Sequence, residues 1–320
     1  MVNETSLLSP FLALFSAVLL LVVIFPTSLC VAIYELVKHR SEPQYPEKIL
    51  ITGAASGIGE AIAVLYASSA ATATPSRNVF LALLDINPTA LERVAETCRA
   101  HGAQVETHVI DVTDGPAMNQ YLLALDTRVG GLDLVHANAG VIPSTVFAGP
   151  NIRNTTIKQR FDSVFSVNGV GCLNTVTPLI EPFKARGHGH FAITASIASF
   201  YLLPDSLSYN ASKAMVYRFA RDLCHIMRPY GVTVTAICPG FVETNITKRL
   251  REEEPEIRIS GMGVQQAAHT IERGIYNKEE IIAFPKFSYF LSWVIRNSPD
   301  HFVGFIYHHL RKNREWHYLG

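Results

Sequence analysis

The feature that most constrains the fold is a glycine-rich turn between a short apolar strand and a helix. Residues 48–52, KILIT, are β-branched and apolar, and an apolar helical pattern follows the turn as far as residue 66. Glycines let a backbone approach a pyrophosphate closely, and the N–H groups at a helix N-terminus bind negative charge. The order of strand, turn and helix therefore predicts a phosphate-binding turn. Its members are Gly53, Ser56, Gly57, Ile58 and Gly59.

Strand-like and helix-like segments alternate after this turn. Further strands are expected at residues 79–84, 105–110, 132–136, 191–195, 232–238 and 280–284, and helices at 154–180 and 207–227. Such alternation predicts a parallel sheet covered by helices on both faces, with ligands at the carboxyl ends of the strands. Residues 48–285 are therefore expected to form a single doubly wound α/β domain.

Tyr209 and Lys213 stand four residues apart, which places them on one face of the expected helix. A free tyrosine has a pKa of about 10, and a neighbouring ammonium group favours the phenolate and lowers that pKa. Ser196 ends the apolar run FAITAS and could hold the oxygen of an alcohol or carbonyl. Tyr34 and Lys38 share the same spacing, so the spacing alone does not decide. The serine and the nucleotide-binding turn favour Tyr209 as an acid–base group.

Asp85 ends the second expected strand and bears on the choice of cofactor. A carboxylate there accepts hydrogen bonds from the adenosine ribose and repels a 2′-phosphate. Ser56 and Ile86, where a phosphate-binding base would sit, are uncharged. The site therefore favours NAD(H), with NADP(H) as the alternative. An aspartate that merely starts a helix ahead of Asn87 is the structural alternative.

The first forty residues predict a membrane anchor. Residues 5–34 contain no charged residue, and about twenty apolar residues suffice to span a bilayer core. A cleaved signal peptide would need a basic start, whereas Glu4 stands here. Lysines and arginines follow the run and none precedes it, which predicts a cytosolic catalytic domain. Residues 1–40 are expected as the anchor and 41–47 as a linker, and Pro26 leaves a single span or a hairpin open.

Charge and metal-ligating residues narrow the function classes. Lysine plus arginine and aspartate plus glutamate both number 27, so no basic field suggests nucleic acid. The five cysteines lack metal or disulfide spacing and are interpreted as reduced, buried thiols. His188 and His190 have no acidic or cysteine partner nearby in the sequence, so no metal site is expected.

Residues 48–285 resemble the short-chain dehydrogenase/reductase family. The matching motifs are the glycine turn, Asp111-Val112, Asn138-Ala139-Gly140, Asn168, Ser196, Tyr209 with Lys213, and Pro239-Gly240 with Thr244. The resemblance implies a Rossmann-like fold with Tyr209 as the general acid/base and Ser196 orienting the substrate oxygen. Lys213 would bind the nicotinamide ribose and depress the tyrosine pKa. Asn168 would hold a water in a proton relay.

The same resemblance implies the rest of the cofactor site. Asp111 and Asn138 would flank the adenine side, and Thr244 would reach the carboxamide or the pyrophosphate. Ala137 departs from the family, where many members have a second asparagine. The full cofactor-binding set would be Gly53, Ser56, Gly57, Ile58, Gly59, Asp85, Asp111, Val112, Asn138, Ala139, Gly140, Tyr209, Lys213, Pro239, Gly240 and Thr244.

A narrower resemblance concerns the substrate. The anchor, the LLDIN run at 83–87 and GHGH at 187–190 are similar to the membrane-associated retinol and 17β-hydroxysteroid dehydrogenase branch, which acts on lipophilic alcohols and ketones. A substrate lid is expected at about 241–263 and around 202–206, with a solvated loop as the alternative. Residues 286–320 are expected as an amphipathic tail. It lies at a bilayer interface with Tyr289, Trp293 and Trp316 at headgroup depth, or packs on the domain as a helix.

Together these features predict a membrane-anchored oxidoreductase that moves a hydride between NAD(H) and an alcohol or carbonyl of a steroid, retinoid or fatty alcohol. The expected location is the endoplasmic reticulum or a lipid droplet if the chain is eukaryotic. An NADPH-dependent reductase of long-chain keto-lipids and a catalytically silent membrane-bound scaffold are the alternatives. Asp85 argues against the first, and the complete set Asn168, Ser196, Tyr209 and Lys213 against the second. Oligomeric state stays open between a homodimer and a homotetramer.

Overall fold

A seven-stranded parallel sheet in the order β3-β2-β1-β4-β5-β6-β7 forms the centre of the domain. The computed structural model describes residues 45–73, 76–147, 155–200, 207–253, 261–296, 298–299, 301 and 303–304. The strands are β1 Lys48–Thr52, β2 Phe80–Asp85, β3 Gln104–Val109, β4 Leu134–Ala137, β5 His190–Thr194, β6 Thr233–Pro239 and β7 Ile281–Phe284. The expected doubly wound α/β fold is confirmed.

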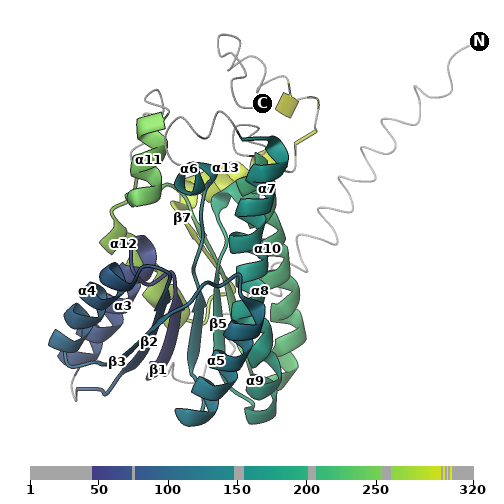
Figure 1. The fold of residues 1–320 in the computed structure, drawn as a ribbon. Coiled ribbons are helices and arrows are strands. Elements are labelled where there is room, and N and C mark those ends of the chain that lie inside the picture. Colours follow the sequence, from purple (N-terminus) through teal and green to yellow (C-terminus); the bar gives the residue numbers. More distant parts are fainter. Residues whose placement is uncertain are drawn as a thin grey trace, which may run out of the picture. The chain divides into compact units, whose positions relative to one another are not determined.

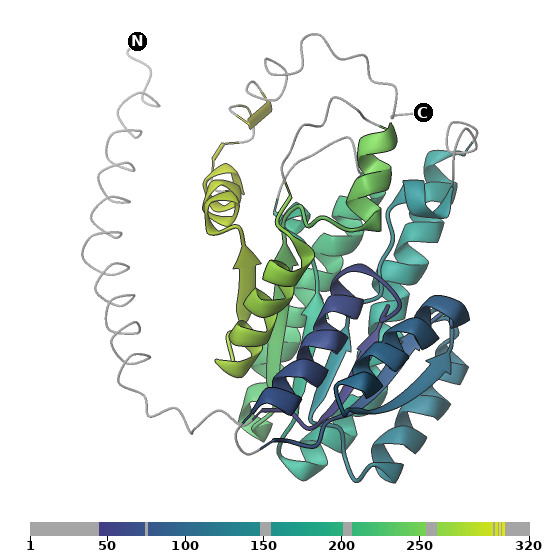
Figure 2. The same ribbon diagram turned by 90° about the vertical axis from the view of Figure 1, so that its left-hand side faces the viewer.

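Helices cover both faces of the sheet (Figure 1). One face carries α3 Gly57–Thr72, α4 Pro88–Ala100 and α12 Val264–Tyr276, which lie side by side in Figure 2. The other carries α5 Gly115–Arg128, α7 Ile157–Phe165, α8 Cys172–Val176, α9 Ile180–Arg186 and α10 Leu207–Met227. Alternate residues of a strand point to opposite faces, so Ile49 and Ile51 enter one core while Leu50 enters the other. Burial on both faces explains why the strands are apolar throughout.

The sheet changes direction of growth between β1 and β4. From β1 the chain adds β2 and β3 on one side, and then returns to add β4 to β7 on the other. A crevice opens at the carboxyl ends of the strands where such a reversal occurs, and ligands of this fold bind there. Three short helices lie near that end, namely α6 Pro143–Val146, α11 Asn245–Glu253 and α13 Lys286–Arg296. The fold therefore places the glycine turn after β1 at the crevice.

Several expected segments lie outside the described residues. They are the anchor at 1–40, residues 41–44 of the linker, 202–206, residues 254–260 of the expected lid, and 305–320 of the tail. Within the described part, one helical stretch, Ile157–Arg186, is long and apolar enough to cross a membrane by length and composition. It contacts α5, α10 and β4 inside the domain, as a core helix does.

The beginning of the expected tail is a helix packed on the domain. Tyr289 of α13 stacks edge-on against Phe200, with ring centroids 5.5 Å apart. Its ring therefore points toward the domain, as expected for the alternative in which this part of the tail packs on the domain as a helix. The reason is that Phe200 and Tyr217 together offer an aromatic surface that the sequence pattern does not show.

Candidate active site

A cavity of about 730 Å³ opens at the carboxyl ends of the strands, within the range of roughly 300–1,000 Å³ typical of ligand sites. Nearly all of the predicted site residues line it. They are Gly53, Ser56, Gly57, Ile58, Asp85, Asp111, Val112, Asn138, Ala139, Gly140, Ser196, Tyr209, Lys213, Pro239, Gly240 and Thr244. Gly59 and Asn168 are absent from the lining. The structure thus brings together residues separated by almost two hundred positions in the sequence.

The glycine turn is compact because its backbone touches other backbone. Gly53 has φ +66°, and a Cβ there would lie 2.8 Å from Cα of Ala139. A Cβ on Gly59 would lie 2.1 Å from the carbonyl oxygen of Gly53. Gly59 therefore acts behind the cavity wall, where it lets α3 start directly against the turn. Only glycine fits these two positions.

The N-terminus of α3 faces the cavity with its first N–H groups uncapped by a side chain. Ser56 occupies the N-cap position in extended conformation and makes no side-chain cap hydrogen bond. The first N–H groups of a helix have no partner within the helix, and they carry partial positive charge. A phosphate group accepts hydrogen bonds from these N–H groups and carries the opposite charge. This end of the cavity therefore suits the pyrophosphate of a dinucleotide.

Asp85 is fixed at the end of β2 by two backbone groups. Its Oδ2 accepts the N–H of Ala55 at 3.0 Å, and its Oδ1 accepts the N–H of Asn87 at 3.0 Å. Asn87, not Asp85, caps α4, because the Asn87 side chain accepts the N–H of Ala90. The alternative in which Asp85 merely starts that helix is therefore wrong. The carboxylate instead connects β2 to the glycine turn and lines the cavity.

Asn138 holds the ends of three strands together. Its Nδ2 donates to the carbonyl oxygen of Thr52 at 3.1 Å, and Thr194 Oγ1 donates to its Oδ1 at 3.4 Å. Thr52 Oγ1 in turn accepts the backbone N–H of Asn138 at 3.1 Å. Sequence reasoning assigns no role to Thr52, which begins the glycine-turn motif, and does not single out Thr194. Both are the last residue of their strands, which is the signal that could have identified them.

Tyr209 and Lys213 lie one turn apart on α10, as the spacing predicts. The Nζ of Lys213 is 5.9 Å from the centroid of the Tyr209 ring, and it donates to the carbonyl oxygen of Thr194 at 2.8 Å. Lys213 is only 4% exposed, and burial lowers its pKa to about 8. The lysine is therefore directed to the end of β5 while remaining within reach of the tyrosine ring.

The surroundings of Tyr209 act on its pKa in opposite directions. Desolvation raises the pKa of Tyr209, and its hydrogen bond with Ser196 opposes that rise. The Lys213 ammonium group is held by the carbonyl oxygen of Thr194. Its lowering of the tyrosine pKa stays a prediction.

Ser196 stands at the end of β5, where it is anchored on both sides. Its Oγ accepts the N–H of Ala198 at 3.1 Å and donates to the carbonyl oxygen of Pro239 at 3.3 Å. It is 8% exposed and lines the cavity beside Tyr209. The hydroxyl group is thus placed where it can contact a substrate oxygen shared with the phenol.

Asn168 supports the site from behind. It lies in a π-helical turn, η3 Ser166–Gly171, between α7 and α8. Its Oδ1 accepts the N–H of Val141 at 2.8 Å, and its Nδ2 donates to Val141 O and Ser212 Oγ, both at 3.0 Å. Ser212 Oγ donates to the carbonyl oxygen of Tyr209 at 2.7 Å. Asn168 therefore ties the loop after β4 to α10; its expected water-holding role stays a prediction.

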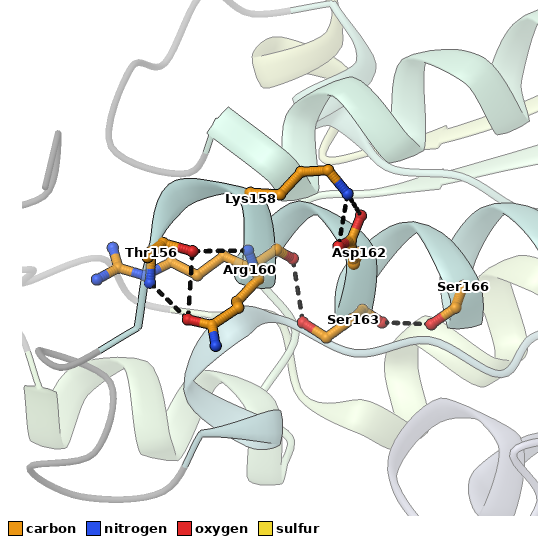
Figure 3. Close-up of polar contacts among 7 residues, drawn as sticks. Thr156, Lys158, Arg160, Asp162, Ser163 and Ser166 are labelled. Atoms are coloured by element: carbon orange, nitrogen blue, oxygen red, sulfur yellow. Dashed lines mark hydrogen bonds and ion pairs between the residues drawn. The ribbon is translucent and has the colours of Figure 1, made fainter.

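The side of the cavity away from the glycine turn is formed partly by α7. A capping box fixes the start of this helix: Thr156 Oγ1 accepts the N–H of Gln159 at 3.2 Å, and Gln159 Oε1 accepts the N–H of Thr156 at 2.8 Å (Figure 3). Ile157, Arg160 and Phe161 of α7 line the cavity. This wall is mostly apolar.

The two histidines considered as metal ligands do not meet. His190 is buried in β5, with its Nε2 2.7 Å from Thr235 Oγ1, whereas His188 is exposed. The four described cysteines are buried and free. Burial raises the pKa of three of them, Cys98, Cys172 and Cys238, to about 12. These thiols are packing groups, as the sequence indicates.

Known proteins with similar sequences or folds identify the family. Residues 47–255 match the short chain dehydrogenase family. An uncharacterized oxidoreductase of Myxococcus xanthus is 30% identical, over 74% of this chain and 86% of its own. Human estradiol 17-beta-dehydrogenase 11 is 27% identical, over 80% of this chain and 81% of its own.

Among solved structures, a short chain dehydrogenase/reductase of Burkholderia phymatum in complex with NAD superposes with a TM-score of 0.67. It is 25% identical, and the match covers 82% of this chain and 99% of that one. The chain therefore belongs to the short chain dehydrogenase family of oxidoreductases.

Proposed function

We propose that this protein transfers a hydride between NAD(H) and the alcohol or carbonyl group of a lipophilic substrate. The observation that carries the proposal is the continuity of the cavity, which runs from the glycine turn and Asp85 to Ser196, Tyr209 and Lys213. When bound, a nicotinamide cofactor supplies or accepts the hydride. The chain's own residues bind the cofactor, orient the substrate and move one proton.

The cofactor would lie along the crevice from the glycine turn to α10. The uncapped N-terminus of α3 would hold the pyrophosphate, and Asp85 the adenosine ribose. Lys213 would reach the nicotinamide ribose. Asp85 favours NAD(H), because its carboxylate would repel the 2′-phosphate of NADP(H). NADP(H) remains the alternative, since a structural relative from Sphingobium yanoikuyae, 22% identical, was solved with NADPH.

Tyr209 is proposed as the group that exchanges the proton with the substrate oxygen, and Ser196 as the group that holds this oxygen. The raised pKa of Tyr209 keeps the phenol protonated at neutral pH, which suits donation to a carbonyl oxygen. Oxidation of an alcohol needs the opposite transfer. The rate of oxidation is therefore expected to rise with pH, and the rate of reduction is not.

A lipophilic substrate is supported by the far wall of the cavity. Its lining includes Ile142, Ile157, Phe161 and Phe241. The human relative, estradiol 17-beta-dehydrogenase 11, is named for a substrate of the same class. The uncharged stretch at residues 5–34 supports attachment to a membrane, with the domain in the cytosol. Endoplasmic reticulum or lipid droplet is the proposed location.

The test is a Tyr209→Phe variant assayed with a panel of steroid, retinoid and fatty alcohols, with NAD and NADP in parallel. Loss of the transferable proton should lower kcat by roughly 10²- to 10⁴-fold. Cofactor affinity should be retained. Tyr217→Phe on the same helix is the matched control, because Tyr217 packs on Phe200 and does not line the cavity.

Two outcomes would count against this function. Wild-type turnover by Tyr209→Phe on several alcohols would contradict the assignment of the proton-transfer group. Cofactor binding by the wild-type protein without turnover of any alcohol or ketone in the panel would instead favour the silent scaffold.

A further inference from the structure

Helix α13 carries an apolar stripe on its outer side. The α13 stripe consists of Phe287, Phe290, Leu291 and Val294, with exposed fractions of 74%, 59%, 42% and 37%. These positions follow the i, i+3, i+4, i+7 spacing that a helix normally turns toward a protein core. In α13 the apolar residues keep this spacing, but their side chains face away from the core.

The inner side of α13 fixes this orientation. Ser288 lines the cavity, Ser292 is fully buried, and the Tyr289 ring packs on Phe200. The Ser292 Oγ donates to the carbonyl oxygen of Tyr289 at 2.6 Å. Rotating the stripe inward would expose Tyr289 and break its contact with Phe200. The outward direction of the stripe is therefore a property of the folded domain.

The α13 stripe lies at the same end of the domain as the cavity. Helix α11 lines the cavity through Asn245, Ile246 and Thr247, as α13 does through Ser288. Two more exposed apolar residues, Ile157 and Leu207, also line it, and Val146 of α6 is 40% exposed. Figure 1 shows α6, α7, α11 and α13 gathered at this end. We call the α13 stripe with Val146, Ile157 and Leu207 the mouth face.

Exposed cations accompany the mouth face. Lys248 and Arg249 lie on α11, and Lys286 begins α13 directly before the stripe. Three carboxylates oppose these cations: Glu252 and Glu253 end α11, and Glu243 is 3.5 Å from Arg251 and so is partly compensated. Apolar side chains flanked by lysine and arginine are typical of surfaces that bind anionic bilayers.

We propose that the mouth face docks on a phospholipid bilayer with anionic headgroups, so that a lipophilic substrate enters the cavity from the acyl region. The flanking cations Lys248, Arg249 and Lys286 would attract anionic headgroups, which favours a bilayer over a second copy of the chain. The uncharged sequence at residues 5–34, proposed above as an anchor, supports the same partner. The docking itself is independent of the proposed function. The route of substrate entry rests on the proposed function.

The first test locates the mouth face by fluorescence. The full-length chain, in a Cys30→Ser background, receives a polarity-sensitive label at Phe287→Cys and is reconstituted into vesicles of phosphatidylcholine and phosphatidylserine. The matched control is Ile226→Cys, because Ile226 is 55% exposed near the opposite end of α10. A nitroxide on the lipid chains should quench the label at 287, and aqueous iodide should quench the label at 226.

Two results of this test would overturn the proposal. Quenching of the label at 287 by iodide alone would show that the mouth face stays in water. Protection from both quenchers would show that protein covers it, either a second copy or the chain's own terminal residues. A label at Leu291→Cys repeats the measurement should the variant at 287 fail to fold.

The second test separates docking from chemistry. Phe287→Ser with Leu291→Ser should raise KM for a long-chain alcohol dissolved in vesicles roughly tenfold, because two large apolar side chains no longer enter the bilayer. The kcat/KM for a short, water-soluble alcohol should not change, and Ile226→Ser should change neither. An unchanged KM for the vesicle-dissolved alcohol would overturn the route of entry. If the wild-type protein turns over no alcohol, the proposed function fails while the fluorescence result still decides the docking.

Discussion

The two ends of the cavity are built in different ways. The proposed cofactor end, at the glycine turn, consists of backbone contacts and hydrogen bonds to the backbone. Gly53 and Gly59 allow chain segments to touch, and Asp85 is held by two N–H groups. The proposed substrate end consists of side chains from α6, α7, α11 and α13, in which apolar groups such as Ile157 and Phe161 stand beside polar ones such as Arg160. Binding at the first end thus depends on atoms that cannot move apart without unfolding the turn. Binding at the second depends on the volume and shape of side chains.

This difference separates two kinds of specificity. A rigid backbone cradle recognises groups common to all dinucleotides, such as phosphates and riboses. An apolar wall selects by fit, and each methylene group changes binding by only about 1–3 kcal/mol. Substitutions at the cofactor end should therefore affect stability and every substrate alike. Substitutions at the substrate end should affect substrates unequally.

The largest expected effect is on Gly59. Alanine is normally the better helix former by about 1 kcal/mol, but Gly59→Ala would place a Cβ 2.1 Å from the Gly53 carbonyl oxygen. We expect a loss of about 3 kcal/mol or more in the free energy of unfolding, measured by thermal and urea denaturation. Gly263→Ala is the control, since no atom lies within 4 Å of its Cβ position. Equal stability of the two variants would refute the rigid cradle.

Asp85→Ser tests the charge at the cofactor end. The variant should shift the ratio of the NADP(H) and NAD(H) dissociation constants toward NADP(H) by roughly tenfold or more, because like charges placed together cost several kcal/mol. Binding is measured by titration of each cofactor. Asp111→Asn, also on the cavity wall, should change both affinities alike. An unaltered ratio in Asp85→Ser would show that another group sets the preference.

Low pH should destabilise the central sheet, which supports both ends of the cavity. Burial lowers the pKa of His136 in β4 and of His190 in β5 to about 3, whereas the unfolded chain takes up these protons near 6.5. Below pH 6.5 the unfolded state therefore binds more protons than the folded state. As the pH decreases, the free energy of unfolding falls by up to about 1.4 kcal/mol per pH unit for each histidine.

Urea denaturation between pH 6.5 and about 5 isolates this effect, because carboxylates with lowered pKa values, such as Glu106, remain ionised there. Replacing His136 by leucine should roughly halve the slope. A stability that is flat over this interval would mean that neither histidine resists protonation in the folded protein.

The smallest effect is expected at Phe161 on α7, which is partly buried and lines the cavity. Phe161→Ala should raise KM for a bulky lipophilic alcohol by roughly tenfold and leave a small alcohol nearly unaffected. Thermal stability should change little. A uniform loss across substrates would mean that the two ends of the cavity do not differ as described.

Much of the fold and the cofactor end could be predicted because each signal is local. The strands, the glycine turn and Asp85 follow from residue patterns within a few positions, and the structure confirms the strands with shifts of one or two residues at their ends. The fifth strand, expected at 191–195, runs His190–Thr194. Hydrogen bonds to the neighbouring strand fix these ends, and a single sequence does not show them.

What could not be predicted depends on contacts between distant segments. The raised pKa of Tyr209 results from desolvation, which arises only in the folded domain. Ser212, Thr52 and Thr194 act through hydrogen bonds that only the folded domain makes. The arrangement of the substrate wall likewise depends on which faces α7, α11 and α13 turn toward the cavity. The substrate itself is thus the least accessible property from sequence.

The π-turn at Ser166–Gly171 has one more consequence, which concerns helix phase. Each residue of an α-helix is rotated by about 100° from the one before it. A wider π-turn therefore changes the direction in which all later side chains of the helix point. The stretch Ile157–Arg186 can therefore point one set of residues at α10 before Asn168 and another set at α5 after it. Deleting a single residue there would rotate α8 and α9 against the sheet while leaving their composition untouched. We expect such a deletion to destabilise the domain more than a conservative exchange of an exposed side chain on the same stretch.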